Sequence, residues 1–146
     1  MGIGAVFAVL AGLAAVRALS SGSSSVSLEP VDLSKIKLIP AKFFRTGPPG
    51  GRRIRWIVMH TAETGESPTS AEGVAWYFHD PKDKNGNPVE ASAHYAVDND
   101  SIVQCVLDKD VAHGAPPMND EGLHIELAGR AAQTAAEWAD PYSDAE

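Results

Sequence analysis

The sequence predicts an α/β domain in which helices flank a mixed central β-sheet. Three observations lead to this class: a nearly continuous apolar strand over residues 54–61, an amphipathic helical segment over residues 67–80, and several short β-rich segments between residues 92 and 129. With 146 residues, of which 44% are hydrophobic, the chain is long enough for one modest core. The order strand, helix, hairpin, strand, helix favours a sheet with both parallel and antiparallel neighbours.

The N-terminal segment is uncharged and apolar over residues 1–16, which is shorter than the roughly 20 residues that span a bilayer. We predict that residues 1–19 are a secretory signal, with a cleavage candidate at Ala18-Leu19-Ser20, or an uncleaved anchor that contacts the membrane through residues 1–16. A buried Ala/Gly-rich helix is the third interpretation. Residues 20–30, rich in Ser and Gly, are predicted to be a linker, so the domain is expected over residues 31–146.

The predicted elements follow in chain order. Residues 31–53 are expected to be irregular because of the Pro and Gly pairs in "RTGPPGGRR", and their basic residues either form a solvated loop or touch an anionic surface. The strand over residues 54–61 ends on a histidine. Ser70 is the predicted N-cap of the helix, and Pro81 with the Asn85-Gly86 turn signal breaks the chain after it.

The second half of the domain is predicted to be mostly β. "SAHYAVD" and "DNDSIVQCVLD" form a hairpin around Asp98-Asn99-Asp100, and "GLHIELAG" is a further strand. Residues 131–146 contain helix formers, are interrupted at Pro141, and end in what resembles the first turn of a helix. The chain is therefore expected to lack the remainder of that helix.

Charge and cysteine content exclude some classes of function. The formal charge is -7, and residues 61–146 hold four Lys/Arg against seventeen Asp/Glu, which argues against binding to nucleic acid. The single cysteine, Cys105, excludes an internal disulfide and a cysteine-rich metal cluster, and its place in a strand predicts a core position.

Histidines are the candidates for chemistry, although none is paired at the i, i+4 spacing of a helical metal site. His60 closes an apolar strand, and ligands collect at the carboxyl ends of strands in open α/β sheets. His113 lies in a Gly/Pro loop, where binding residues are common. His79 is interpreted as a partner of the helix dipole. The remaining two histidines are His94 and His124.

Glu126 shares one face of its predicted strand with His124, because side chains alternate between the two faces. The opposite face, with Leu123, Ile125 and Leu127, is expected to be the core face. An unpaired buried carboxylate is costly. Glu126 is therefore predicted to line a cleft or to be paired, unless the strand is an edge strand whose polar face is open to water.

Four motifs together resemble the zinc-dependent N-acetylmuramoyl-L-alanine amidases, the family of phage amidase endolysins and peptidoglycan recognition proteins. They are "RWIVMHTAE", "SAHYAVDNDSIVQCV", "DVAHGAP" and "NDEGLHIELAG", and their order and spacing match from about Ile39 to the end. The tail "QTAAEWADPYSDAE" resembles the endolysin branch in particular. The resemblance implies a mixed sheet with a zinc ion in a groove on its face.

The resemblance also implies roles for individual residues. His60 matches the family's first Zn²⁺ ligand, and Glu126 matches its general acid/base. His94 matches a histidine close to the site, and His113 falls on a tryptophan position of the family's loop; both are expected to bind substrate. Zinc would polarise the carbonyl between N-acetylmuramic acid and L-alanine and acidify a bound water, and a carboxylate would move the proton.

The family's second and third zinc ligands are expected beyond residue 146. Three hypotheses follow: a peptidoglycan amidase, a non-catalytic peptidoglycan-binding module, and a truncated inactive remnant without two zinc ligands. We expect a monomer, exported or anchored in the membrane, that acts at the cell wall on peptidoglycan and binds no nucleic acid.

Overall fold

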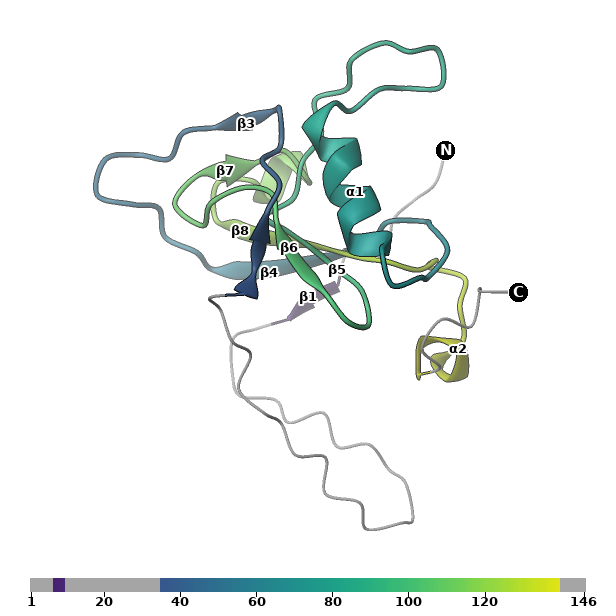
Figure 1. Ribbon diagram of the computed structural model, residues 1–146. Helices are drawn as coiled ribbons and strands as arrows, with labels where there is room; N and C mark the ends of the chain where they lie inside the picture. The colour runs from purple at the N-terminus through teal and green to yellow at the C-terminus, as the bar shows by residue number, and fades with distance from the viewer. Residues whose placement is uncertain (1–6, 10–34, 140–146) are drawn as a thin grey trace.

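The computed structural model describes residues 7–9 and 35–139 (Figure 1). In chain order its elements are β1 (Phe7–Val9), β2 (Lys37–Leu38), β3 (Phe44–Arg45), β4 (Trp56–Thr61), α1 (Ser70–His79), β5 (Tyr95–Val97), β6 (Ile102–Gln104), β7 (Val111–Ala112), the 3-10 helix η2 (Pro116–Met118), β8 (Gly122–Leu127) and α2 (Ala135–Ala139).

Six strands form one mixed sheet in the order β1-β4-β8-β5-β6-β2. Strands β4, β8 and β5 run parallel to their neighbours in this central part, and β6 pairs parallel with β2. The pairs β1 with β4 and β5 with β6 are antiparallel. A separate two-stranded sheet joins β3 to β7. The predicted α/β class with a mixed central sheet is therefore confirmed.

The central pair of strands, β4 and β8, fixes which side chains share a face. In this parallel pair His60 is opposite Glu126, and Val58 is opposite His124. Paired residues project to the same side of a sheet, as do residues two apart on one strand. His60, His124 and Glu126 therefore lie on one face.

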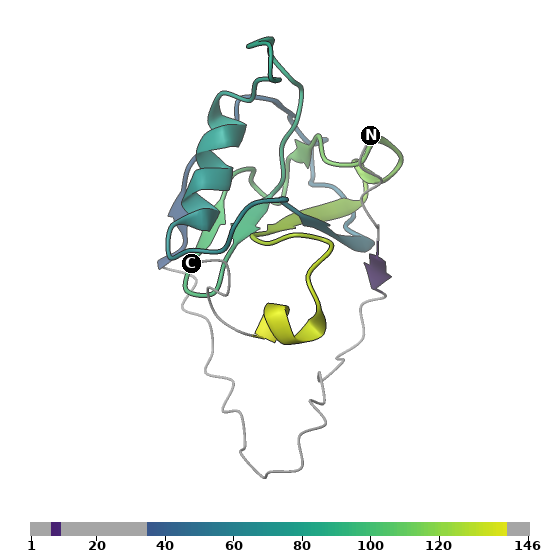
Figure 2. The ribbon, with the colours of Figure 1, turned by 90° about the vertical axis from the view of Figure 1, so that its right-hand side faces the viewer.

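Helix α1 packs on this same face, over β5 and β6 (Figure 2). Its buried side chains belong to the main buried cluster, together with Ala96 and Val103 of the sheet. Ala96 is opposite Glu126 in the register, so the core lies on the face of the polar residues. The predicted core face was therefore wrong: Leu123, Ile125 and Leu127 are half-buried, because α1 covers the other side.

The start of α1 also differs from the prediction. Thr69 is the N-cap, and Ser70 is the first helical residue. The Ser70 hydroxyl donates a hydrogen bond to the Gly65 carbonyl at 2.9 Å, while Asp98 of the hairpin turn accepts from the Ala71 N–H at 2.9 Å. The helix thus receives its cap from a residue far along the chain, which the local sequence does not show.

The hairpin, the irregular segment before β4 and the two ends of the chain were also predicted from the sequence. The hairpin around residues 98–100 is present as β5 and β6. Residues 35–53 are mostly irregular, but they contain two-residue strands whose partners lie far along the chain, so no local pattern indicated them. Three residues of the predicted signal or anchor form β1, which pairs with β4, and the rest of that segment lies outside the described residues. The helix expected after Pro141 also lies outside them. Among the residues that the structure describes, no helix is long and apolar enough to span a membrane.

Candidate functional site

A cavity of about 430 Å³ opens between α1 and the carboxyl end of β4. The cavity is in the place that α/β architecture favours, because α1 covers β5 and β6 but leaves the neighbouring part of the face open. Most of its wall is apolar, with a few polar groups. It is lined by Thr61, Ala62, Thr64, Gly73, Val74, Tyr77, Phe78, Ala91 and Glu126.

Glu126 is the one carboxyl group among the described residues that line this cavity. The register brings it beside His60 on the neighbouring strand. Burial raises the pKa of the Glu126 carboxyl to about 7, because desolvation disfavours the charged form. A carboxyl with a pKa near neutrality can both accept and donate a proton under physiological conditions. The prediction that Glu126 lines a cleft is confirmed.

His60 lies next to Glu126 and faces a second histidine. Its Nε2 atom is 3.2 Å from Nδ1 of His124, and the two rings are stacked with centroids 5.5 Å apart. His60 is half-buried, and burial lowers the pKa of its imidazole. The ring is therefore held in the neutral form, in which a nitrogen lone pair is available to a proton donor or a metal ion.

His124 is fully buried and lies at the centre of a row of three imidazoles. Its ring stacks on that of His94 as well, with centroids 5.8 Å apart and an interplanar angle of 9°. Burial lowers the pKa of His124 to about 4, and the neighbouring His60, His94 and Arg52 add to this effect. Among the described residues, Nε2 of His124 has no hydrogen-bond partner.

His94 is the third imidazole of this row and stacks on His124. It is fully buried, and its Nδ1 atom accepts a hydrogen bond from the backbone N–H of His124 at 3.0 Å. Its Nε2 atom lies 2.7 Å from Arg52 Nη2 and 3.2 Å from the Asp110 carbonyl oxygen. Burial lowers the pKa of His94 to about 4. His94 presents no surface to a ligand here, so its predicted substrate contact stays a prediction and its observed contacts are structural.

His113 lies on the loop after β7 and is half-buried. Its backbone N–H donates to the Ser92 hydroxyl at 2.9 Å, and its carbonyl accepts from the Ser92 N–H at 3.2 Å. The ring nitrogen Nδ1 is 3.9 Å from the Glu90 carboxylate. These bonds attach the loop to the segment that carries Ala91 of the cavity. The predicted role of His113 in substrate binding remains a prediction.

The other two candidates have structural positions. Cys105 is buried, as predicted, and burial raises the pKa of its thiol to about 12, which makes it a poor nucleophile. His79 ends α1, where its Nδ1 atom is 2.9 Å from the Pro40 carbonyl oxygen. The cavity residues Thr64, Tyr77 and Phe78 could not be predicted as site residues, because neither their chemistry nor their spacing in the sequence distinguishes them from ordinary helix and loop residues.

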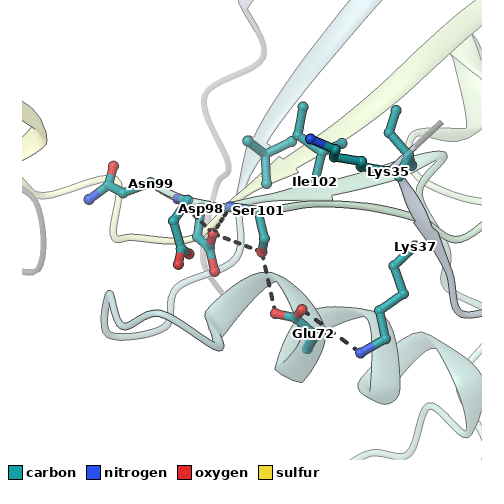
Figure 3. Close-up of a pocket in the computed structure, with 10 residues that line it drawn as sticks. Lys35, Lys37, Glu72, Asp98, Asn99, Ser101 and Ile102 are labelled. Carbon is teal, nitrogen blue, oxygen red and sulfur yellow. Dashed lines mark hydrogen bonds and ion pairs between the residues drawn. The ribbon is translucent and has the colours of Figure 1, made fainter. Parts of the chain in front are cut away.

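A larger cavity, of about 720 Å³, lies elsewhere, beside the start of α1 and the tip of the β5–β6 hairpin (Figure 3). Its polar groups bind one another. The Ser101 hydroxyl donates to Asp98 at 2.9 Å and to Glu72 at 3.3 Å, and Lys37 lies 3.9 Å from Glu72. The histidines and Glu126 are not among its lining residues, so the smaller cavity is the candidate site.

The described residues do not complete a catalytic zinc site. No three His, Cys, Asp or Glu side chains come together there in an arrangement that could hold a metal ion. Such a site needs three protein ligands and one open position. Even the closest pair of imidazoles, His60 and His124, would provide only two nitrogen ligands, which is fewer than the three that a catalytic zinc needs. We therefore assign no chemical step to a metal ion.

Fold and site together define an α/β domain with a cavity, lined in part by Glu126, on one face of a mixed sheet. The model of the N-acetylmuramoyl-L-alanine amidase family matches residues 50–146, about two thirds of the sequence. The chain belongs to this family, as the motif resemblance indicated. Neither the curated proteins nor the solved structures include a match.

Proposed function

We propose that this chain hydrolyses peptidoglycan at the amide bond between N-acetylmuramic acid and L-alanine, with Glu126 as general acid/base. The observation that carries the proposal is the position of Glu126, which lines the cavity beside α1 and is in register with His60. Membership of the amidase family supports the same reaction. The cavity is large enough for a short part of the substrate on either side of the scissile bond.

In this proposal the apolar residues of the cavity bind the substrate, and Glu126 transfers the proton. Apolar side chains such as Val74 and Phe78 exclude water and pack against the substrate. Glu126 takes a proton from the water that attacks the lactyl carbonyl carbon. When the carbon–nitrogen bond breaks, Glu126 returns the proton to the departing amine of L-alanine, so the carboxyl ends the cycle unchanged.

Zinc, on which amidases of this family generally depend, is part of the proposal as a bound cofactor. His60 is the proposed ligand from β4, in accordance with its neutral ring and its place at the end of the strand. When bound, zinc would supply Lewis acidity toward the carbonyl and the water. Elemental analysis of the purified full chain tests this point directly, and a metal-free chain that still hydrolyses its substrate would refute it.

The substitution Glu126→Gln tests the catalytic proposal. It keeps the shape of the side chain but cannot accept the proton, so release of L-alanine-bearing peptides from purified cell wall should fall by about 10²- to 10⁴-fold in zinc-supplemented buffer. Co-sedimentation with the same cell wall should be unchanged. The control is Glu121→Gln, which removes only a partly exposed ion pair with Arg55. Full activity of Glu126→Gln would disprove the assignment.

A non-catalytic peptidoglycan-binding module is the second candidate. It is favoured by one observation, the lack of a complete three-ligand metal site among the described residues. In that case the wild-type chain would bind soluble muropeptides in chelator-treated buffer and release no peptide at any zinc concentration. Hydrolysis by the wild-type chain would exclude this candidate.

We also propose that the chain acts at the cell wall as an exported or membrane-anchored monomer. The support is the uncharged apolar run over residues 1–16 and the accessibility of peptidoglycan only outside the cytoplasm. Fractionation of cells that express the full chain, compared with a form that lacks residues 1–19, tests the localisation. Light scattering of the purified chain tests the monomer. Recovery of both forms in the cytoplasm would contradict the proposed export.

A further inference from the structure

Gly73 is an unusual residue for the interior of a helix. It lies in the first half of α1, where a glycine lowers helix stability relative to alanine. Close packing against a neighbouring segment is the ordinary structural reason for such a glycine. That reason is absent here, because a Cβ atom at Gly73 would have no atom within 4 Å. The space that Gly73 leaves open belongs to the cavity beside Glu126, since both residues line it.

Tyr77 lies one turn after Gly73 on the same face of α1. Residues four apart are neighbours on a helix surface, and side chains lean toward the helix N-terminus, so the Tyr77 ring is directed toward Gly73. Gly73 and Tyr77 are exposed, whereas Val74 and Phe78, which follow them in the sequence, are buried. The exposed pair therefore gives the cavity an open wall, made of uncovered helix backbone beside an aromatic ring.

The charges of the cavity indicate which part of the substrate lies on this wall. Of the described residues that line it, none is Lys or Arg, and Glu126 is an acid. The stem peptide of peptidoglycan ends in a free carboxylate, which would find no cationic partner on this wall. N-acetylmuramic acid is uncharged as long as its lactyl group forms the scissile amide. Its ring also presents apolar C–H groups, for which an aromatic side chain supplies a large contact area.

We propose that Gly73 and Tyr77 form the subsite for the sugar ring of N-acetylmuramic acid, which packs against the Tyr77 ring and over the uncovered backbone at Gly73. The lactyl amide then extends toward Glu126 in the same cavity. Gly73 thus lowers the stability of α1 and keeps the space that the sugar needs. The choice of substrate rests on the proposed function, whereas sugar binding is measured without hydrolysis.

Two soluble, uncharged ligands separate the sugar from the rest of the substrate. N-acetylmuramoyl-L-alaninamide carries the sugar and the scissile amide, and lactyl-L-alaninamide carries the same amide without the sugar. Calorimetry uses the full chain with Glu126→Gln, so that the ligands stay intact. The sugar-bearing ligand should bind at least about tenfold more tightly. Equal affinities for the two ligands would show that the cavity does not bind the sugar, and would overturn the proposal.

Substitutions at Gly73 test the open wall. Gly73→Ala places a methyl group in the space for the sugar, so the affinity for the sugar-bearing ligand should fall about fivefold, while the urea unfolding midpoint stays at or above that of wild type. Lower affinity at equal or higher stability excludes misfolding as the cause. Gly73→Leu, which also suits a helix, should weaken binding further. Wild-type affinity in folded Gly73→Leu would refute the subsite.

Substitutions at Tyr77 test the contact with the ring. Tyr77→Ala should lower the affinity for the sugar-bearing ligand by about five- to tenfold and leave that for the sugar-free ligand unchanged, while Tyr77→Phe should stay within about twofold of wild type. Trp76→Ala is the matched control, because Trp76 is the neighbouring aromatic residue, is 57% exposed and is not among the described lining residues. Equal losses in Tyr77→Ala and Trp76→Ala, or in Tyr77→Ala and Tyr77→Phe, would contradict stacking on Tyr77.

Hydrolysis is measured separately, on chains that retain Glu126. In Gly73→Ala and Tyr77→Ala, KM for the sugar-bearing ligand should rise while kcat stays within about twofold of wild type. Sugar binding that depends on Tyr77, without hydrolysis by the wild-type chain, would leave the subsite standing and would remove the proposed function. Hydrolysis with an unchanged KM in both variants would do the opposite.

Discussion

At the scale of single residues, the site depends on groups whose chemistry is changed by burial. Glu126 would be an ordinary ionised carboxylate in water, but in the cavity wall its pKa rises to about 7. His124 and His94 are neutral because burial lowers the pKa of each to about 4. A small residue completes this arrangement, since the backbone of Gly114 approaches the ring of His124 too closely for any side chain.

Gly114→Ala should destabilise the domain and disturb the histidine pair. The new methyl group would lie 2.6 Å from Nδ1 of His124, whose side chain is fully buried, so either the ring or the loop must shift. Overpacking of this kind costs about 1–3 kcal/mol. Urea unfolding monitored by fluorescence should therefore show a lower midpoint for the variant.

Gly73→Ala is the matched control, because it adds the same methyl group where no atom lies within 4 Å. Gly73 lies inside α1, and the change should leave stability unchanged or raise it by up to about 1 kcal/mol. Equal urea unfolding midpoints for Gly114→Ala and wild type would show that the loop can move away from the His124 ring at little cost. That result would contradict the tight contact.

At the scale of elements, one turn organises both the hairpin and the helix. Asp98 accepts hydrogen bonds from the backbone N–H and the hydroxyl of Ser101, at 2.7 and 2.9 Å, and from the N–H of Ala71 at 2.9 Å. Burial alone would raise the pKa of Asp98, but these bonds outweigh it and lower the pKa. The start of α1 is thereby attached to the β5–β6 turn, which positions the helix that forms one wall of the cavity.

Asp98→Ala should loosen this junction. Several backbone N–H groups would lose their acceptor at once, so the free energy of unfolding should fall by about 1–3 kcal/mol. Hydrogen exchange should speed up first at the N-terminal turn of α1 and in the hairpin turn. Asn99→Ala, an exposed change in the same turn, is the control and should have little effect. Unchanged exchange at Ala71 in Asp98→Ala would contradict this account.

At the scale of the whole molecule, Arg52 connects segments that are far apart in the sequence. Its guanidinium donates to the carbonyl oxygens of Asp108 and Gly122 at 2.7 and 2.8 Å, and it lies 2.7 Å from Nε2 of His94. It therefore joins the irregular N-terminal part to the segment after β6, to the start of β8 and to the histidine row. The sequence suggested a solvated loop here, and for Arg52 that interpretation was wrong.

Arg52→Lys should reduce stability even though it keeps the charge. Lysine has no planar fork of N–H groups with which to reach both the Asp108 and the Gly122 carbonyl oxygens, so at least one of these partly exposed hydrogen bonds would be lost, at a cost of about 0.5–1.5 kcal/mol for each bond. Arg53→Lys is the control, since the neighbouring Arg53 is exposed. The comparison is the difference between the two variants in their thermal and urea unfolding midpoints. Equal effects of the two substitutions would disprove the bridging role.

Local patterns in the sequence were sufficient for β4, α1, the β5–β6 hairpin and β8, because apolar periodicity and turn residues act within a few neighbours. The same reasoning found His60 at the end of a strand and Glu126 on a polar strand face, and the motif resemblance assigned their roles. The same reasoning missed β2, β3 and β7, because each of them pairs over only two residues with a strand from a distant segment.

The sequence by itself determined the class of fold and the family, and the motif resemblance pointed to His60 and Glu126, the two residues for which we propose roles in hydrolysis. Only the tertiary structure decided that the core lies on the side of the polar face, that Glu126 titrates near neutrality, and that His124 meets His60. The physical reason is that burial and register are properties of the packed sheet. His60 and His124 are 64 residues apart, and only the parallel pairing of β4 with β8 brings their ring nitrogens within 3.2 Å.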